Sequence, residues 1–104
     1  MFVLSSQILD LCVLATVNKE DTYGYKLTQD LMESISISES TLYPVLRRLQ
    51  KNNCLSTYDQ PYGGRNRRYY QITPEGKRQL KEYIKNWINY KESIDEIVGG
   101  DLND

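Results

Sequence analysis

The sequence of 104 residues contains no histidine, and this absence excludes more functions than any other feature of its composition. Histidine is the commonest general base of enzymes and the commonest metal ligand, so Ser-His and Cys-His catalytic arrangements are ruled out. No cluster of carboxylates in the middle of the chain takes its place. We therefore expect a protein that is not an enzyme and that needs no metal or cofactor.

Cysteine and long apolar runs are also scarce. Cys12 and Cys54 lie in apolar or strand-like segments without metal-site spacing, which indicates free buried thiols in a reducing compartment and leaves a disulfide open. No stretch approaches the roughly 18 apolar residues that span a bilayer. The apolar residues 1–4 lack a basic stretch before them, and Asp10 interrupts the run, unlike a signal peptide. We expect a cytoplasmic protein without membrane contact.

Charge is nearly balanced in sum but unevenly distributed along the chain. Residues 41–81 hold nine lysines and arginines against two acids, whereas residues 1–40 and 82–104 each hold two lysines against six acids. A basic middle between acidic ends indicates one charged face that suits nucleic acid, with a plain solvated surface as the alternative. Apolar residues make up only 39% of the chain, so we expect a second copy to cover part of its surface.

Hydrophobic periodicity and turn residues predict four helices and one β-hairpin. Pro44 leaves the start of the third helix open, because proline is tolerated in a first turn and costs about 3 kcal/mol deeper in. The expected elements are a helix over 4–18, a helix over 23–34 capped by Thr22, a turn over 34–40, a helix from Ser38 or Ser40 to Asn52–Asn53, strands over 55–58 and 68–73 joined by a projecting eight-residue connection, and a helix from Thr73 to Gly99.

The order helix, turn, helix, hairpin predicts a helix-turn-helix with a two-stranded wing, in which the third helix enters a major groove. Its polar side offers hydroxyls and Arg47 to base edges, while neighbouring basic side chains suit phosphates. Arg65 follows two glycines at the hairpin tip and suits a narrow minor groove. The predicted DNA-binding residues are Tyr23, Tyr25, Lys26, Ser38, Ser40, Thr41, Tyr43, Arg47, Arg48, Lys51, Arg65 and Arg67.

The last helix has the clearest start of the sequence, because Thr73, Pro74 and Glu75 supply a capping hydroxyl, a first-position proline and a first-turn acid. Its apolar residues then follow the 3–4 spacing of a helix–helix seam. We expect a DNA-binding domain over 1–73, a dimerisation helix over 74–98 and a disordered tail over 99–104. The predicted dimer contacts are Ile8, Leu11, Leu80, Tyr83, Trp87, Tyr90 and Ile94.

Three blocks of the sequence, at residues 23–27, 40–49 and 63–76, resemble the PadR family of transcriptional regulators in order and spacing. The resemblance covers residues 5 to about 98 and implies a winged-helix repressor that dimerises through its first and last helices. It maps the groove-reading helix onto 38–52 and the wing onto 55–73. Asn53 stands where the family usually has glycine, which implies a left-handed turn there. The single C-terminal helix resembles the family's short subfamily.

Two interpretations of Trp87 stay open. It lies on the seam of the last helix and suits the core of a dimer; by resemblance to drug-responsive short members of the family, it lines a pore between subunits and stacks on a planar effector. The sequence as a whole predicts a homodimeric repressor on a pseudo-palindromic operator of double-stranded DNA. The alternative function is a winged-helix module that binds proteins and no DNA.

Overall fold

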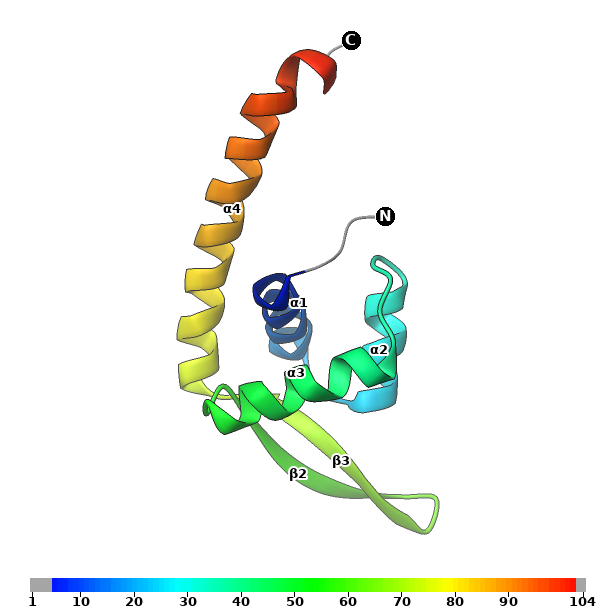
Figure 1. The fold of residues 1–104 in the computed structure, drawn as a ribbon. Coiled ribbons are helices and arrows are strands. Elements are labelled where there is room, and N and C mark those ends of the chain that lie inside the picture. The colour runs from blue at the N-terminus through cyan, green and yellow to red at the C-terminus, as the bar shows by residue number, and fades with distance from the viewer. Residues whose placement is uncertain (1–4, 103–104) are drawn as a thin grey trace.

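Four helices and one three-stranded antiparallel sheet build the described part of the chain, residues 5–102 of the computed structural model (Figure 1). The sheet order β1-β3-β2 makes β3 central. No helix in this range is both long and apolar enough to cross a membrane. In chain order the elements are α1 (Ser6–Lys19), β1 (Thr22–Tyr23), α2 (Gly24–Met32), α3 (Glu39–Lys51), β2 (Leu55–Tyr62), β3 (Arg65–Ile72) and α4 (Pro74–Leu102).

The core forms around α1, which lies between α4 and the α2–α3 pair (Figure 1). One side of α1 is buried against the other helices and the sheet, whereas its opposite side, which carries Ile8, Leu11, Cys12 and Ala15, is only half-buried. The helix begins at Ser6 because the Ser5 hydroxyl accepts a hydrogen bond from the Ile8 N–H, at 3.2 Å. The core residues of the four helices and the sheet are Leu9, Val13, Leu14, Val17, Leu27, Leu31, Ile37, Leu42, Val45, Leu46, Leu49, Cys54, Leu55, Tyr70 and Leu80.

A short strand replaces the expected cap of the second helix. Thr22 does not cap α2; it pairs with Tyr70 in β1, and Tyr23 takes the cap position without a side-chain hydrogen bond. The sequence shows no sign of this strand because its partner lies in the hairpin, far along the chain. The expected two-stranded wing is present as β2 and β3, and β1 adds a third strand to it that the sequence did not predict.

Helix α3, the expected groove-reading helix, begins earlier than the preference of Pro44 for a first helical turn would place it. Ser38 caps it by accepting from the Thr41 N–H, so Pro44 is its sixth residue and lies beyond the first turn. The Ser40 carbonyl consequently receives no hydrogen bond from residue 44. The end of the helix is as expected, because Asn53 has a φ of 61° and takes the left-handed conformation.

The hairpin is longer and its turn is tighter than the sequence suggested. β2 and β3 pair in continuous register from Leu55–Ile72 out to Tyr62–Arg65, so the expected eight-residue connection is wrong. Only Gly63 and Gly64 form the turn, with φ values of 58° and 84°, and two successive positive φ values are typical of a type I′ turn. Pro61 is tolerated within the pairing because β2 lies at the edge of the sheet.

The start of α4 is confirmed and its end is not. Thr73 accepts a hydrogen bond from the Gly76 N–H at 2.9 Å, with Pro74 in the first helical position. The helix then continues through residues 99 and 100 to Leu102, so the expected stop and the disordered stretch from 99 are wrong; residues 103–104 lie outside the described range. Glycine lowers helix stability by about 1 kcal/mol and does not forbid the helical conformation.

A buried carboxylate joins three helices. Asp10 of α1 forms an ion pair with Arg48 of α3, and its second oxygen accepts a hydrogen bond from the Tyr83 hydroxyl of α4 at 3.2 Å. The Asp10 side chain is 9% exposed and the Arg48 side chain 39%. Burial, with the negative charge of Asp10, raises the pKa of Tyr83 and keeps its hydroxyl a donor. These three side chains fix α3 and α4 relative to α1.

Replacing Asp10 by alanine should lower the free energy of unfolding by about 2 kcal/mol, because Arg48 and Tyr83 both lose a partner away from bulk water. Urea denaturation followed by circular dichroism, at one fixed protein concentration, measures the change. The matched control is Arg78→Ala, which removes the exposed ion pair to Glu75 and should cost less than about 1 kcal/mol. Equal stability of the two variants would contradict the structural role of Asp10.

Candidate nucleic-acid interface

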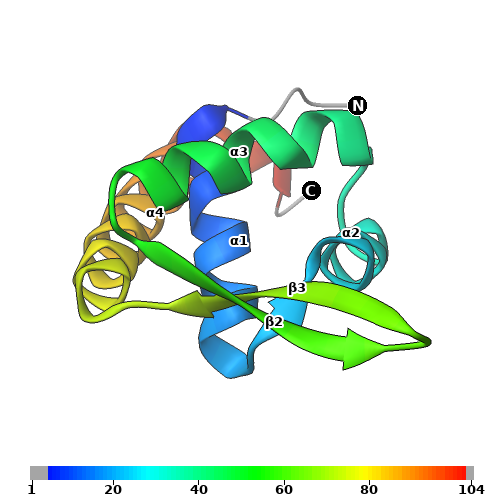
Figure 2. The ribbon, with the colours of Figure 1, turned by 90° about the horizontal axis from the view of Figure 1, so that it is seen from below.

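A groove runs between α3, the start of α2 and the wing, which is the β2–β3 hairpin. Figure 2 shows α3 and the wing on the same side of the molecule. Arginines from α3 and from the wing line it, and Asp59 is the only acidic residue in the lining. The groove encloses about 630 Å³ and is lined by Tyr23, Gly24, Tyr25, Tyr43, Arg47, Gln50, Asp59, Asn66, Arg67, Arg68 and Tyr70.

The outward side of α3 presents a continuous polar surface. Leu42, Val45, Leu46 and Leu49 are buried on the inner side, as the periodicity predicted, which turns the remaining positions outward. The Ser38 hydroxyl lies 2.9 Å from the Ser40 hydroxyl and 3.2 Å from that of Thr41, so these groups form one exposed cluster at the helix start. The exposed residues predicted to meet DNA on this helix are Ser38, Ser40, Thr41, Tyr43, Arg47 and Lys51.

Tyr43 points from α3 across the groove to the first residue of α2. A Cβ atom added at Gly24 would lie 2.7 Å from the Tyr43 hydroxyl oxygen and about 3.1 Å from its ring. Glycine is therefore required at position 24 for this approach. The tyrosine still exposes 37% of its surface, so one part of the ring supports the groove wall and the rest faces solvent.

The wing carries a stack of aromatic rings and one arginine, which we call the tyrosine–arginine stack. The Arg67 guanidinium lies between the rings of Tyr23 and Tyr62, 3.9 Å and 3.3 Å from their centres. Tyr69 extends this group: its ring meets the Tyr23 ring edge-to-face at 5.4 Å and stacks on the Tyr58 ring at 5.5 Å. The Tyr58 hydroxyl donates a hydrogen bond to Asp21, which holds the stack against the body of the domain. This hydrogen bond raises the pKa of Tyr58 to about 12.

Two basic side chains that were predicted to contact phosphate pair with acidic residues of the protein itself. Lys26 lies 2.9 Å from Asp30 and 3.9 Å from Glu20, in a depression apart from the groove, and its charge is neutralised there. Arg48 bonds to Asp10 on the inner flank of α3. The sequence identified both side chains as basic. Helical spacing could have indicated Asp30 as the partner of Lys26, but not Asp10, which lies 38 residues from Arg48. By contrast, Arg47 and Arg65 have no acidic partner within residues 5–102.

Comparison with known proteins identifies the family. A profile described as the transcriptional regulator PadR-like family matches residues 13–82. The chain belongs to the PadR-like family. Transcriptional regulator Rv3488 of Mycobacterium tuberculosis is 33% identical over 91 residues, which cover 86% of this chain and 82% of that protein.

Solved structures agree with this assignment. Smu.1704 of Streptococcus mutans is 43% identical, with a TM-score of 0.88 over 95% of this chain and 93% of its own. A PadR-like transcriptional regulator of Bacillus cereus, BC4206, is 30% identical, with a TM-score of 0.80 over 88% and 91%. The protein is thus a winged-helix transcriptional regulator that binds DNA, and it is not an enzyme. The alternative of a protein-binding module without DNA is set aside.

Six groove residues of this PadR-family chain were not among the predicted DNA contacts, and three of them, Gln50, Asn66 and Arg68, have exposed side chains that can donate hydrogen bonds. Gln50 follows Arg47 by three residues, so helical spacing alone could have placed it on the same face. Arg68 and Asn66 lie on β3, and their position depends on a register that the sequence did not specify. Arg68 pairs across the strands with Asp59 at 3.8 Å, which moderates its charge.

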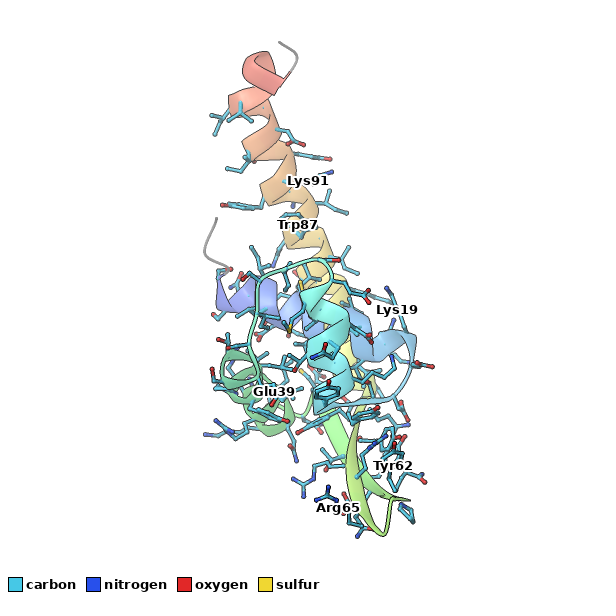
Figure 3. All side chains as sticks on the ribbon, turned by 90° about the vertical axis from the view of Figure 1, so that its right-hand side faces the viewer. Lys19, Glu39, Tyr62, Arg65, Trp87 and Lys91 are labelled. Carbon is cyan, nitrogen blue, oxygen red and sulfur yellow. The ribbon has the colours of Figure 1, made fainter. Side chains whose placement is uncertain are left out.

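A second hollow of this PadR-family regulator lies between α1 and α4, away from the DNA-facing groove. Trp87, Tyr83 and Tyr90 line one side of it, and Ile8 and Leu11 the other. Figure 3 shows Trp87 on α4 well separated from Tyr62 and Arg65, which lie at the far end of the wing.

Both cysteines are free, and burial raises the pKa of their thiols. Leu80, a predicted dimer contact, is 6% exposed and belongs to the core of its own chain.

Proposed function

We propose that this PadR-family regulator is a homodimeric repressor that binds a pseudo-palindromic operator in the cytoplasm. The observation that carries the proposal is an apolar face without a partner in a single chain. Along α4, from position 84 onward, large apolar side chains point to solvent: Ile84, Trp87, Ile88, Tyr90, Ile94 and Ile97. Contiguous exposed apolar residues of this kind mark protein–protein contacts.

The half-buried side of α1 extends this apolar face. Ile8 and Leu11 lie beside Tyr83 and Trp87 across the hollow between α1 and α4. Figure 1 shows the distal part of α4 projecting past the other described elements, none of which covers it. We infer that the same face of a second copy packs here, because a two-fold axis lets one patch cover its own equivalent. Of the predicted dimer contacts, this keeps Ile8, Leu11, Tyr83, Trp87, Tyr90 and Ile94.

A two-fold dimer predicts how the groove meets DNA. Each copy places α3 in a major groove, with Arg47 directed to base edges and Lys51 to phosphates. Arg65 at the wing tip reaches the adjacent minor groove. Two such units about 34 Å apart match half-sites one helical turn apart, which makes the operator pseudo-palindromic. A dimer on such a site excludes polymerase from an overlapping promoter, and this is the proposed basis of repression.

Arg47→Ala should weaken binding to the preferred duplex by about 1–3 kcal/mol and relax base preference at one position in each half-site. Lys51→Ala should weaken binding to all duplexes similarly and reduce the slope of log K against log salt by about 0.9 per phosphate contact. The duplex is one that the wild-type protein selects from a random pool, and titrations at several salt concentrations measure both effects. Unchanged base preference in Arg47→Ala would refute the proposed reading face.

Ile94→Asp should convert the dimer to monomer, since the substitution puts a charge into the apolar seam. Sedimentation velocity at a fixed protein concentration measures the mass, and binding to the selected duplex should fall along with it. Asn89→Asp adds the same charge at an exposed polar position of α4 and should leave the dimer intact. A wild-type protein that sediments as a monomer would overturn the proposed assembly.

We also propose that the hollow beside Trp87 accepts a planar small-molecule effector. Three aromatic side chains, Tyr83, Trp87 and Tyr90, line one side of it, and the Trp87 and Tyr90 rings lie 6.4 Å apart, which suits stacking on a flat ligand. Such a ligand would lie at the dimer contact and alter the relative placement of the two DNA-binding units. Trp87 would then belong both to the dimer core and to the effector site.

Because Trp87 is the only tryptophan, intrinsic fluorescence reports on this hollow directly. Titration with flat cationic dyes, acridine orange among them, should give saturable quenching. N-acetyltryptophanamide under identical conditions corrects for collisional quenching and for absorption by the dye. A linear response across the whole panel, equal to that of the free amide, would argue against an effector site.

A further inference from the structure

The position of Arg67 in the sequence predicts a contact with DNA. Its neighbours in the structure are instead those of a residue that stabilises the fold. It follows the wing tip and borders the groove, but its guanidinium lies between the rings of Tyr23 and Tyr62. A planar cation between two aromatic faces has satisfied interactions on both sides. An arginine held in this way would have to leave both rings before it could reach a phosphate.

The strand register groups Arg67 with the tyrosines of the wing, although its neighbours Asn66 and Arg68 border the groove as it does. Arg67 lies opposite Gln60, and the alternation of β-strands puts its side chain on the same face of the hairpin as Tyr69 and Tyr62. Arg68 and Asn66, one residue to either side, are on the other face. Arg67 and the tyrosines around it therefore form one continuous layer that runs from the wing tip to the body of the domain.

The Tyr23–Gly24 pair connects this layer to α3. Tyr23 contacts Arg67 and Tyr69 of the wing, and the next residue, Gly24, receives the Tyr43 ring from α3. The wing and α3 therefore contact two consecutive residues, the wing through Tyr23 and α3 through Gly24. The hairpin has little else to hold its outer half, since the residues around its tip are exposed.

We propose that Arg67 is a positioning residue that, with Tyr23 and Tyr62, holds the wing at a fixed angle to the recognition helix and makes no contact with DNA phosphate. The proposal rests on the proposed function for the role of the wing, whereas the contacts themselves belong to the free protein. Arg65, at the tip of the wing, then reaches its groove without the entropic cost of ordering the hairpin on binding.

Hydrogen exchange of the free protein tests the structural half of this inference. Arg67→Ala and Tyr62→Leu should each speed amide exchange in the hairpin peptides around residues 59–68 by about tenfold, the loss expected from one or two cation–π contacts. Arg65→Ala, at the solvent-exposed tip, is the matched control and should leave exchange unchanged. Wild-type exchange in both Arg67→Ala and Tyr62→Leu would overturn the proposal.

Affinity for the duplex selected by the wild-type protein tests the other half. Arg67→Lys keeps the charge but cannot lie flat between two rings, so it should bind about as poorly as Arg67→Ala, roughly tenfold below wild type. A phosphate contact would instead be rescued by lysine, and wild-type affinity of Arg67→Lys would overturn the proposal. If the wild-type protein selects no duplex, the proposed function fails while hydrogen exchange still decides the role of Arg67.

Discussion

The Asp10 carboxylate is shared between helices that belong to different functional surfaces. Its ion pair to Arg48 fixes α3, which faces the DNA-binding groove, and its hydrogen bond from Tyr83 fixes α4, which carries the exposed apolar face. A carboxylate this deeply buried is costly unless both oxygens are bonded, and here both are. Asp10 therefore helps to set the position of α3 relative to the exposed apolar face of α4.

A second set of contacts, at Tyr23 and Gly24, also holds α3 in place. Tyr43 packs over Gly24, and Tyr23 beside it contacts the wing through Arg67. The ion pair at Asp10 connects α3 to α1 and α4, whereas the Tyr23–Gly24 pair connects it to α2 and to the hairpin. The basic residues of the chain consequently divide into two groups. Arg48 and Arg67 hold elements together, and Arg47 and Arg65 remain open to solvent.

Local signals in the sequence predicted much of this fold, because they act within a few residues. Thr73, through its hydroxyl, and Pro74 define the start of α4. Asn53, in the left-handed conformation, marks the end of α3. Two of the errors arose where a partner lies far along the chain. Strand β1 depends on Tyr70, and Arg48 depends on Asp10, 38 residues away. A basic side chain shows its charge in the sequence, but its partner is known only from the tertiary structure.

The contacts of Asp10 and those of the Tyr23–Gly24 pair limit which movements of the protein an effector can cause. Moving α3 within its own subunit would break a buried ion pair and displace Tyr43 from Gly24, both of which cost free energy without compensation. The distal part of α4 has no such contacts within the described chain, and the hollow beside Trp87 lies next to it. If two copies pair through this face, a ligand there changes the angle between subunits more readily than the shape of either one. The spacing of the two α3 helices, and hence the fit to the two half-sites, is then the variable that an effector controls.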